Sequence, residues 1–335
     1  MICRISAMSS SSGVCLLLLL LAILYFAEQV TCSRLVVEDE DIGVCQQLTS
    51  NGSYVPTNGI PDSDADNILV ALNLEYLECE FFLYAVTGEG LDSVEPSLAG
   101  GGPSPIGPER ANLDALTGDI IYQFALQEIG HLRAIKQTIP DMFPRVQLDL
   151  RKEVFSSSME AALGTQLQEP FNPYNDSLSF LLASYLIPYV GLTGYVGAIP
   201  NLQSERSKRL VAGLLAVESG QDAVVRTLLY QRKDDEVPAL SMKVSEVTNK
   251  LSELRNKLGG KGNVDEGLEV SSCLGAEGKV TGNSLAGDNN SVGYARTPAE
   301  IFRIVYGSGN ESVPGGFYPQ GCKGRFAESF LAPNH

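Results

Sequence analysis

The sequence contains no tryptophan and only two histidines, His131 and His335, and this scarcity excludes several kinds of site. Structural zinc sites need clustered cysteine and histidine ligands, but the chain has no CxxC pair and no Cys/His cluster. A serine hydrolase needs a histidine partner for its serine, and the chain has no Gly-x-Ser-x-Gly elbow to carry such a serine. The chain also has no P-loop for binding a nucleotide. The absence of tryptophan also removes a common surface for stacking sugars.

Basic residues are scarce as well. The chain has 24 Lys and Arg against 40 Asp and Glu, which gives a formal net charge of -16 at pH 7. A surface of this sign repels nucleic acids and anionic membranes, so we expect neither as a partner. A plainer interpretation is that the acidic surface keeps an abundant protein soluble.

Residues 1–32 have the pattern of a secretory signal peptide. Arg4 and a serine run precede an apolar stretch from Val14 to Ala27, which is shorter than the ~20 residues that span a bilayer. The alternative is an uncleaved membrane anchor, but Glu28 and Gln29 do not resemble a stop-transfer flank. We therefore expect a secreted protein, located outside the cell or in a cell wall.

Two further features agree with a secreted protein. Asn-x-Ser motifs predict glycosylation sites at Asn51, Asn175, Asn289 and Asn310. Three cysteines lie in polar or Gly-rich stretches, and two of them can form a disulfide in an oxidising compartment, without the sequence saying which two; they are Cys45, Cys273 and Cys322. A fourth cysteine, Cys79, lies within a helical pattern and is expected to be a buried apolar residue.

Beyond the leader, the chain divides into an extended arm (33–62), a helical bundle (63–258) and a Gly-rich extension (259–335) that we expect to pack on the bundle. Apolar residues at helical spacing predict four long helices in the bundle, at about 64–87, 112–139, 177–199 and 205–231. Asp62 or Ser63 is expected to cap the first of them. Shorter helices are expected at about 149–165 and 240–258. Residues 88–108 break the helical pattern, with a loop at 100–105, and the extension shows one helix, which Thr297 caps.

The third long helix has no charged residue between Ser177 and Ser204, a pattern that a membrane helix also shows. It contains Pro188, three glycines, several hydroxyl groups and tyrosines, which suit close packing inside a bundle at least as well. We therefore interpret it as the central helix of the bundle, because a helix that is apolar on all sides is buried.

Helical spacing also brings candidate metal ligands together. Glutamate and histidine at positions i and i+3 lie on one face of a helix, and Glu128 and His131 have this spacing in the second long helix. Glu218 and Gln221 repeat it in the fourth helix, with glutamine in place of the histidine. The first helix offers Glu75 or Glu78 from its inner face. The sequence therefore predicts one Glu-x-x-His motif and one altered copy.

Five segments of the chain resemble the ferritin-like domain of plant desiccation-related proteins. They are 74–82 (LEYLECEFF), the motif of Glu128 and His131, 189–195 (YVGLTGY), 216–221 (AVESGQ) and 294–300 (YARTPAE). The resemblance covers about residues 60–320. It implies an all-α fold, a ferritin-like four-helix bundle with extra helices, in a secreted or cell-wall protein that accumulates on water loss.

The chain departs from a complete di-iron site at two positions. Gln221 stands where a second histidine is expected, and Pro188 looks like the place of a third-helix glutamate. Six residues remain as a degenerate set, able to hold one iron, manganese or zinc ion or to pack without metal: Glu75, Glu78, Glu128, His131, Glu218 and Gln221.

These departures favour a non-enzymatic stress protein that protects the cell exterior, with no catalytic residue assigned. One alternative is a metal-binding, ferroxidase-like protein that limits oxidative damage. Another is an interaction module whose Gly-rich tail or amphipathic fifth helix binds a partner. In either non-enzymatic case, cell-wall components or further copies of the chain are the expected partners.

Overall fold

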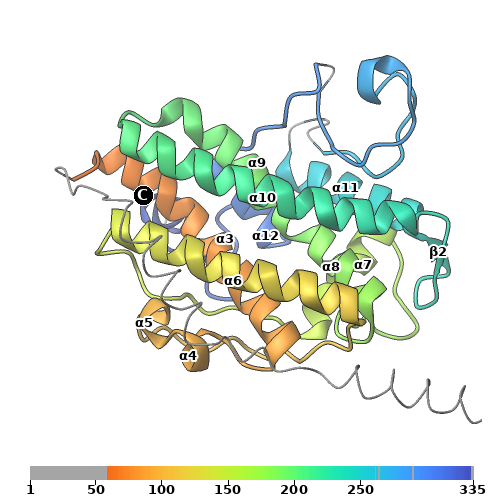
Figure 1. Ribbon diagram of the computed structural model, residues 1–335, viewed down its shortest axis with the longest axis horizontal. Helices are drawn as coiled ribbons and strands as arrows, with labels where there is room; N and C mark the ends of the chain where they lie inside the picture. Colours follow the sequence, from red (N-terminus) through yellow and green to blue (C-terminus); the bar gives the residue numbers. More distant parts are fainter. Residues whose placement is uncertain (1–58, 261, 263–264, 289, 333–335) are drawn as a thin grey trace, which may run out of the picture. The chain divides into compact units, whose positions relative to one another are not determined.

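Four long helical segments form a bundle in the computed structural model, which describes residues 59–260, 262, 265–288 and 290–332 (Figure 1). They are α3 (Asp62–Thr87), α6 (Ala115–Thr138), the pair α8 (Ser177–Leu186) and α9 (Pro188–Ala198), and α10 (Glu205–Gln231). α3 packs against α6 and α9, and α10 packs against α8 and α9. The predicted all-α fold and its four long helices are confirmed.

Shorter elements surround the bundle. They are α4 (Leu91–Val94), α5 (Pro96–Ala99), α7 (Lys152–Leu163), β1 (Glu236–Val237), β2 (Met242–Lys243), α11 (Val244–Gly259), α12 (Pro298–Val305), α13 (Arg325–Leu331) and two 3-10 turns, Ile199–Asn201 and Ala276–Gly278. The loop predicted at 100–105 is confirmed, and two short helices precede it within the stretch 88–108. Two predictions were wrong here. The predicted helix 240–258 begins only at Val244, because Met242–Lys243 form β2 and pair with β1, and the extension carries α13 as a second helix.

Side-chain caps fix some helix starts and not others. Asp114 caps α6 by accepting hydrogen bonds from the N–H groups of Leu116 and Thr117. At α12 the predicted capping box is confirmed, since Thr297 and Glu300 bond each other's backbone. The predicted cap of α3 was wrong: Pro61 occupies the N-cap position, where it has no side chain that can accept a hydrogen bond.

The third long helix is interrupted rather than continuous. α8 ends at Leu186 and α9 begins at Pro188, because proline has no N–H to donate and its ring clashes with the carbonyl of residue i−4. The whole segment Ser177–Asn201 is long and apolar enough to cross a membrane, yet 89% of its most apolar window is buried inside the protein. It is the core helix of the bundle in this structure.

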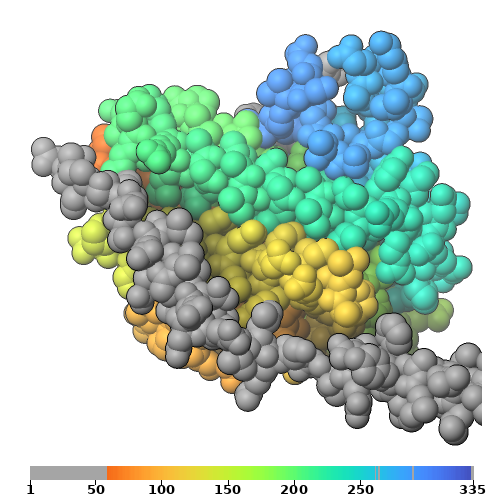
Figure 2. All heavy atoms as spheres, viewed as in Figure 1, coloured from red at the N-terminus to blue at the C-terminus, as the bar shows by residue number. Residues whose placement is uncertain are grey.

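Aromatic packing and the C-terminal extension complete the bundle. The ring of Phe81 stacks on that of Phe180 with centroids 4.6 Å apart. Tyr318 donates a hydrogen bond to the carbonyl of Asn73 in α3, and the Asn73 amide donates to the carbonyl of Lys323. The chain from Gly59 onward forms one compact unit. Figure 2 shows α10 lying between α6 and the extension on one face of this unit.

Several predictions fall on residues that the structure does not describe. They include the signal peptide, most of the arm, Cys45, Asn51 and Asn289. Among described residues, Asn175 and Asn310 are exposed, and their glycosylation stays a prediction.

The described cysteines are unpaired. Cys79 is buried, as predicted, Cys322 is also buried and Cys273 is exposed. A Cys273–Cys322 disulfide is therefore absent from the described part of the chain, and a bond from either residue to Cys45 stays a prediction.

Candidate metal centre

Three helices bring the predicted ligands to one point inside the bundle. Glu75 comes from α3, Glu128 and His131 come from α6, and Glu218 comes from α10. One donor atom from each of the four lies within 4.8 Å of the other three, and all four side chains are buried. The i, i+3 spacing on α6 points Glu128 and His131 to the same side, as the sequence predicted.

The distances between donor atoms suit a shared cation. His131 Nδ1 lies 3.1 Å from Glu75 Oε2, 3.3 Å from Glu128 Oε2 and 3.4 Å from Glu218 Oε1. Atoms bound to one metal at about 2.0–2.2 Å are about 3 Å or slightly more apart. A single ring nitrogen can donate only one good hydrogen bond, so three carboxylates around it are better explained as ligands of one ion.

Burial and mutual repulsion make these carboxylates hard to ionise without a cation. Burial, reinforced by the neighbouring carboxylates, raises the pKa of both Glu78 and Glu128, and burial raises the pKa of Glu218. Burial is also the largest single influence on Glu75 and His131 and opposes the ionisation of both. Their mutual attraction and the surrounding hydrogen bonds together outweigh it, which lowers the pKa of Glu75 and raises that of His131. We call these five residues the acidic cluster.

Glu78 and Gln221, the two remaining predicted ligands, lie at the same place. Glu78 is one turn after Glu75, and burial together with repulsion from the nearby Glu218 carboxylate raises its pKa. The Gln221 side-chain amide donates to Glu128 Oε1 at 2.7 Å and to Gln127 Oε1 at 3.0 Å. The structure therefore brings the six predicted residues to one region of the bundle. The group whose donor atoms lie within 4.8 Å of one another includes Glu75 but not Glu78, and Glu78 as a ligand stays a prediction.

The sequence reasoning missed one partner of the cluster. The hydroxyl of Tyr195, from α9, donates a hydrogen bond to Glu75 Oε1. Such a bond fixes the orientation of a ligating carboxylate. The sequence contained one indication of this role, because Tyr195 carries a hydroxyl group in a buried helix that has no charged residue.

A metal ion fits these residues. Glu78 Oε2, Glu218 Oε2 and Gln221 Oε1 are buried oxygens without a hydrogen-bond partner among the described residues. An unsatisfied buried acceptor costs about 1–3 kcal/mol, and a bound cation would remove that cost. Carboxylate oxygens with one imidazole suit iron, manganese or zinc.

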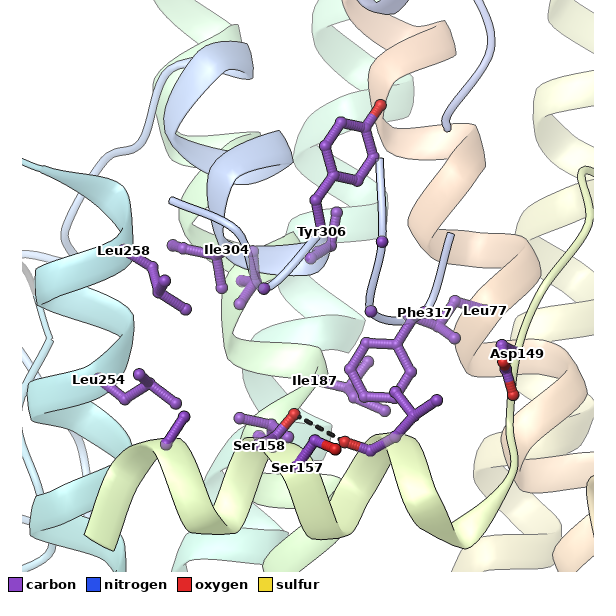
Figure 3. Close-up of a pocket in the computed structure, with 18 of the residues that line it drawn as sticks. Leu77, Asp149, Ser157, Ser158, Ile187, Leu254, Leu258, Ile304, Tyr306 and Phe317 are labelled. Atoms are coloured by element: carbon purple, nitrogen blue, oxygen red, sulfur yellow. Dashed lines mark hydrogen bonds between the residues drawn. The ribbon is translucent and has the colours of Figure 1, made fainter. Parts of the chain in front are cut away.

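A separate cavity of about 420 Å³ lies between α7, α11, α12 and the extension (Figure 3). Its walls are mostly apolar, with Leu254, Ile304 and Phe317 among them and Ser157 and Ser158 at one side. None of the six predicted ligands lines it. This cavity is therefore separate from the candidate metal centre.

The model of the ferritin-like domain matches residues 63–231, half of the chain, and this stretch contains the whole acidic cluster. The chain belongs to the ferritin-like family. The resemblance to desiccation-related proteins is confirmed at the same time, because this ferritin-like chain is 52% identical to the desiccation-related protein PCC13-62 of Craterostigma plantagineum over 79% of its own length and 85% of the relative's.

A second relative of this ferritin-like protein is the ferritin-like catalase Nec2 of Nesocodon mauritianus. The two are 53% identical over 82% of this chain and 88% of the relative. No solved structure matches the chain significantly. Against the usual ferritin-like pattern of two single glutamates and two Glu-x-x-His motifs, this member keeps one motif intact and carries Gln221 in the other.

Proposed function

We propose that this ferritin-like protein binds iron or manganese in the acidic cluster and uses it to convert hydrogen peroxide to water and oxygen, 2 H₂O₂ giving 2 H₂O and O₂. The observation that carries the proposal is the geometry of His131 Nδ1, which lies 3.1–3.4 Å from three buried carboxylates on three helices. The relative named a ferritin-like catalase supports peroxide as the substrate.

A bound iron or manganese ion would supply electron exchange, so that two electrons and two protons given up by one peroxide, which becomes O₂, are taken up by a second, which becomes two waters. The chain's own residues place and protect that chemistry. Glu75, Glu128, Glu218 and His131 provide the ligand atoms, and the Tyr195 hydroxyl and Gln221 amide hold Glu75 and Glu128 in place. Because the site is buried, only small molecules can reach it.

The test is metal content together with oxygen release. The purified protein is loaded with Mn²⁺ or Fe²⁺ and desalted, its metal is measured by elemental analysis, and oxygen evolution from hydrogen peroxide is followed with an electrode. We expect bound metal and oxygen evolution, and loss of both in the variant Glu128→Ala, His131→Ala. The matched control is Glu205→Ala, Lys208→Ala, another i, i+3 pair on the exposed surface of α10, which should change neither.

The three outcomes separate the functions. Metal with oxygen evolution supports the proposal. Metal without oxygen evolution, but with oxygen consumption on adding ferrous iron, would move the function to the ferroxidase-like alternative. A wild-type chain that stays empty after loading would contradict both, leaving the bundle as a scaffold.

A non-enzymatic protective role is the second candidate. It is favoured by Gln221, which offers an amide where a complete site has a second imidazole, and by the desiccation-related relative. Under either candidate we propose secretion to the cell exterior or wall, where the acidic surface keeps the protein soluble as water is lost. Cell-wall components or further copies of the chain remain the proposed partners.

A further inference from the structure

The third helix contributes no carboxylate to the metal centre. α9 begins at Pro188, and Gly191, one turn later, faces α3 without a side chain. A β-carbon built on Gly191 would lie 3.1 Å from Glu78 Oε1 and 3.6 Å from Leu74 Cδ2. A side chain at position 191 would therefore crowd Glu78, whose carboxylate would have to shift by a few tenths of an ångström.

Glu78 occupies the space that this glycine leaves open. Its side chain is 1% exposed, and its Oε2 atom has no hydrogen-bond partner among the described residues. It lies on the turn of α3 that follows Glu75, close to the carboxylate of Glu218, which comes from α10. A carboxylate placed in this way between helices, with one oxygen unused, is arranged as a metal ligand is.

We infer that Glu78 of α3 supplies the carboxylate that a ferritin-like third helix otherwise provides, and that Gly191 makes the space for it. The inference rests on the proposed metal binding. It gives the centre two adjoining metal positions. Glu75, Glu128, His131 and Glu218 Oε1 form one. Glu78 forms the other with two oxygens that lack a hydrogen-bond partner among the described residues, Glu218 Oε2 and Gln221 Oε1, so that Glu218 belongs to both.

The two positions differ in chemistry. The first includes an imidazole, a donor that suits iron and zinc. The second contains only carboxylate and amide oxygens, which suit a hard divalent cation such as manganese. The chain therefore keeps a two-metal centre without the second histidine. Its second position is selective for an ion that prefers oxygen ligands.

Manganese stoichiometry tests the inference. The purified full-length chain is dialysed against Mn²⁺, bound manganese is measured by elemental analysis, and electron paramagnetic resonance detects coupling between two ions. We expect two coupled Mn²⁺ ions in the wild type and a single uncoupled ion in Glu78→Gln. Gly191→Ala changes no ligand, yet it should weaken the second position by about tenfold or more, because it displaces Glu78.

Control variants distinguish a failure of this inference from a failure of the proposed function and from a failure to fold. Gly213→Ala makes the same change on α10, where no atom lies within 4 Å of the added carbon, and should keep both ions. Two coupled ions in both the wild type and Glu78→Gln, or one ion in both, would overturn the inference while the proposed function stands. No ion in any variant would overturn the proposed function as well. Thermal melting confirms that each variant folds, and if Gly191→Ala does not, Glu78→Gln decides.

Discussion

This bundle contains two buried clusters of charged side chains, and they differ in how the cost of burying charge is compensated. The acidic cluster gathers four glutamates around His131. The second, which we call the arginine cluster, gathers Arg226, Arg255 and Arg296 around Asp265, and all four side chains are at most 1% exposed. An isolated charge in such an interior is costly unless it is paired and hydrogen-bonded.

The arginine cluster meets this cost from within the chain. Arg255 binds Asp265 through two nitrogens, at 2.5 and 2.9 Å, and Arg296 binds the same carboxylate at 3.2 Å. Arg226 donates to backbone carbonyls, among them those of Gly267 and Asn283, and all three guanidinium groups lie within 6 Å of the ring centroid of Tyr189.

Among the described residues, the acidic cluster sets four carboxylates against one histidine, with hydrogen bonds from Tyr195 to Glu75 and from Gln221 to Glu128. Its surplus carboxylates must either keep protons or receive a cation from outside the chain. The difference indicates that the arginine cluster is a structural part of the bundle and that the acidic cluster is the place for a ligand.

The largest expected effect comes from breaking the arginine cluster. Arg255→Met keeps the volume of the side chain but leaves Asp265 with less compensation, and we expect it to lower the free energy of unfolding by about 3–5 kcal/mol. Denaturant unfolding measures this loss. Arg232→Met, which removes an exposed pair with Asp235, should cost about 1 kcal/mol or less. Equal losses in the two variants would contradict the structural role of Arg255.

Asp222 gives the arginine cluster a pH dependence. Burial, partly offset by Arg226 and Arg255, raises the pKa of Asp222 from 3.8 to about 6. The folded state therefore holds this proton more tightly than the unfolded state, so stability from this group is greatest below pH 3.8 and falls as the pH rises to 6. The loss is about 3 kcal/mol at most.

Denaturant unfolding of Asp222→Asn and the wild type between pH 4 and 7 isolates this loss. The acidic cluster has the same composition in both proteins, so its own titration largely cancels in the difference. The stability difference should shift in favour of the variant as the pH rises from 4 to about 6 and level off above it. A difference that does not change with pH would show that Asp222 has an ordinary pKa.

Metal loading should stabilise the protein through the acidic cluster alone. Free Mn²⁺ at a hundred times its Kd should raise the free energy of unfolding by about 2.7 kcal/mol, and a chelator should reverse the gain. Because Glu78, Glu128 and Glu218 have raised pKa values in the metal-free protein, binding releases protons, and the gain should grow as the pH rises.

Thermal melts with metal and with chelator, at pH 6 and pH 8, measure this stabilisation. In Glu128→Ala, His131→Ala the gain should disappear, whereas a surface variant such as Arg232→Met should keep it. The same gain in the double variant would place the stabilising metal elsewhere.

The two clusters also differ in how far the sequence could predict them. Glu128 and His131 share a helix at i, i+3, and the altered copy at Glu218 and Gln221 has the same spacing. Helical periodicity alone therefore indicated the acidic cluster. Asp265 lies in a Gly-rich stretch without periodicity, and its arginine partners come from α11 and from the extension. Nothing local in the sequence indicates that these segments meet.

Helix ends were harder to predict than helices. The apolar pattern placed α10 at its observed bounds, since Ser204 caps its start and the pattern stops at Gln231. The same pattern runs through Pro188 without interruption, because burial on all sides hides the missing backbone hydrogen bond. The contact between Gly191 and Glu78 depends on that break and on the packing of α9 against α3, neither of which is visible as a motif.

A matched substitution in each cluster gives the smallest effect and the sharpest contrast. In metal-free protein, Glu128→Gln removes a buried carboxylate that has too few partners, and its new amide can donate to the neighbouring carboxylates, so we expect a gain of about 1 kcal/mol in the free energy of unfolding. Asp265→Asn, the same chemical change, should instead destabilise, because it deprives two arginines of their charge partner. Denaturant unfolding in chelator measures both. Destabilisation in both variants would mean that the acidic cluster, like the arginine cluster, is balanced without a cation.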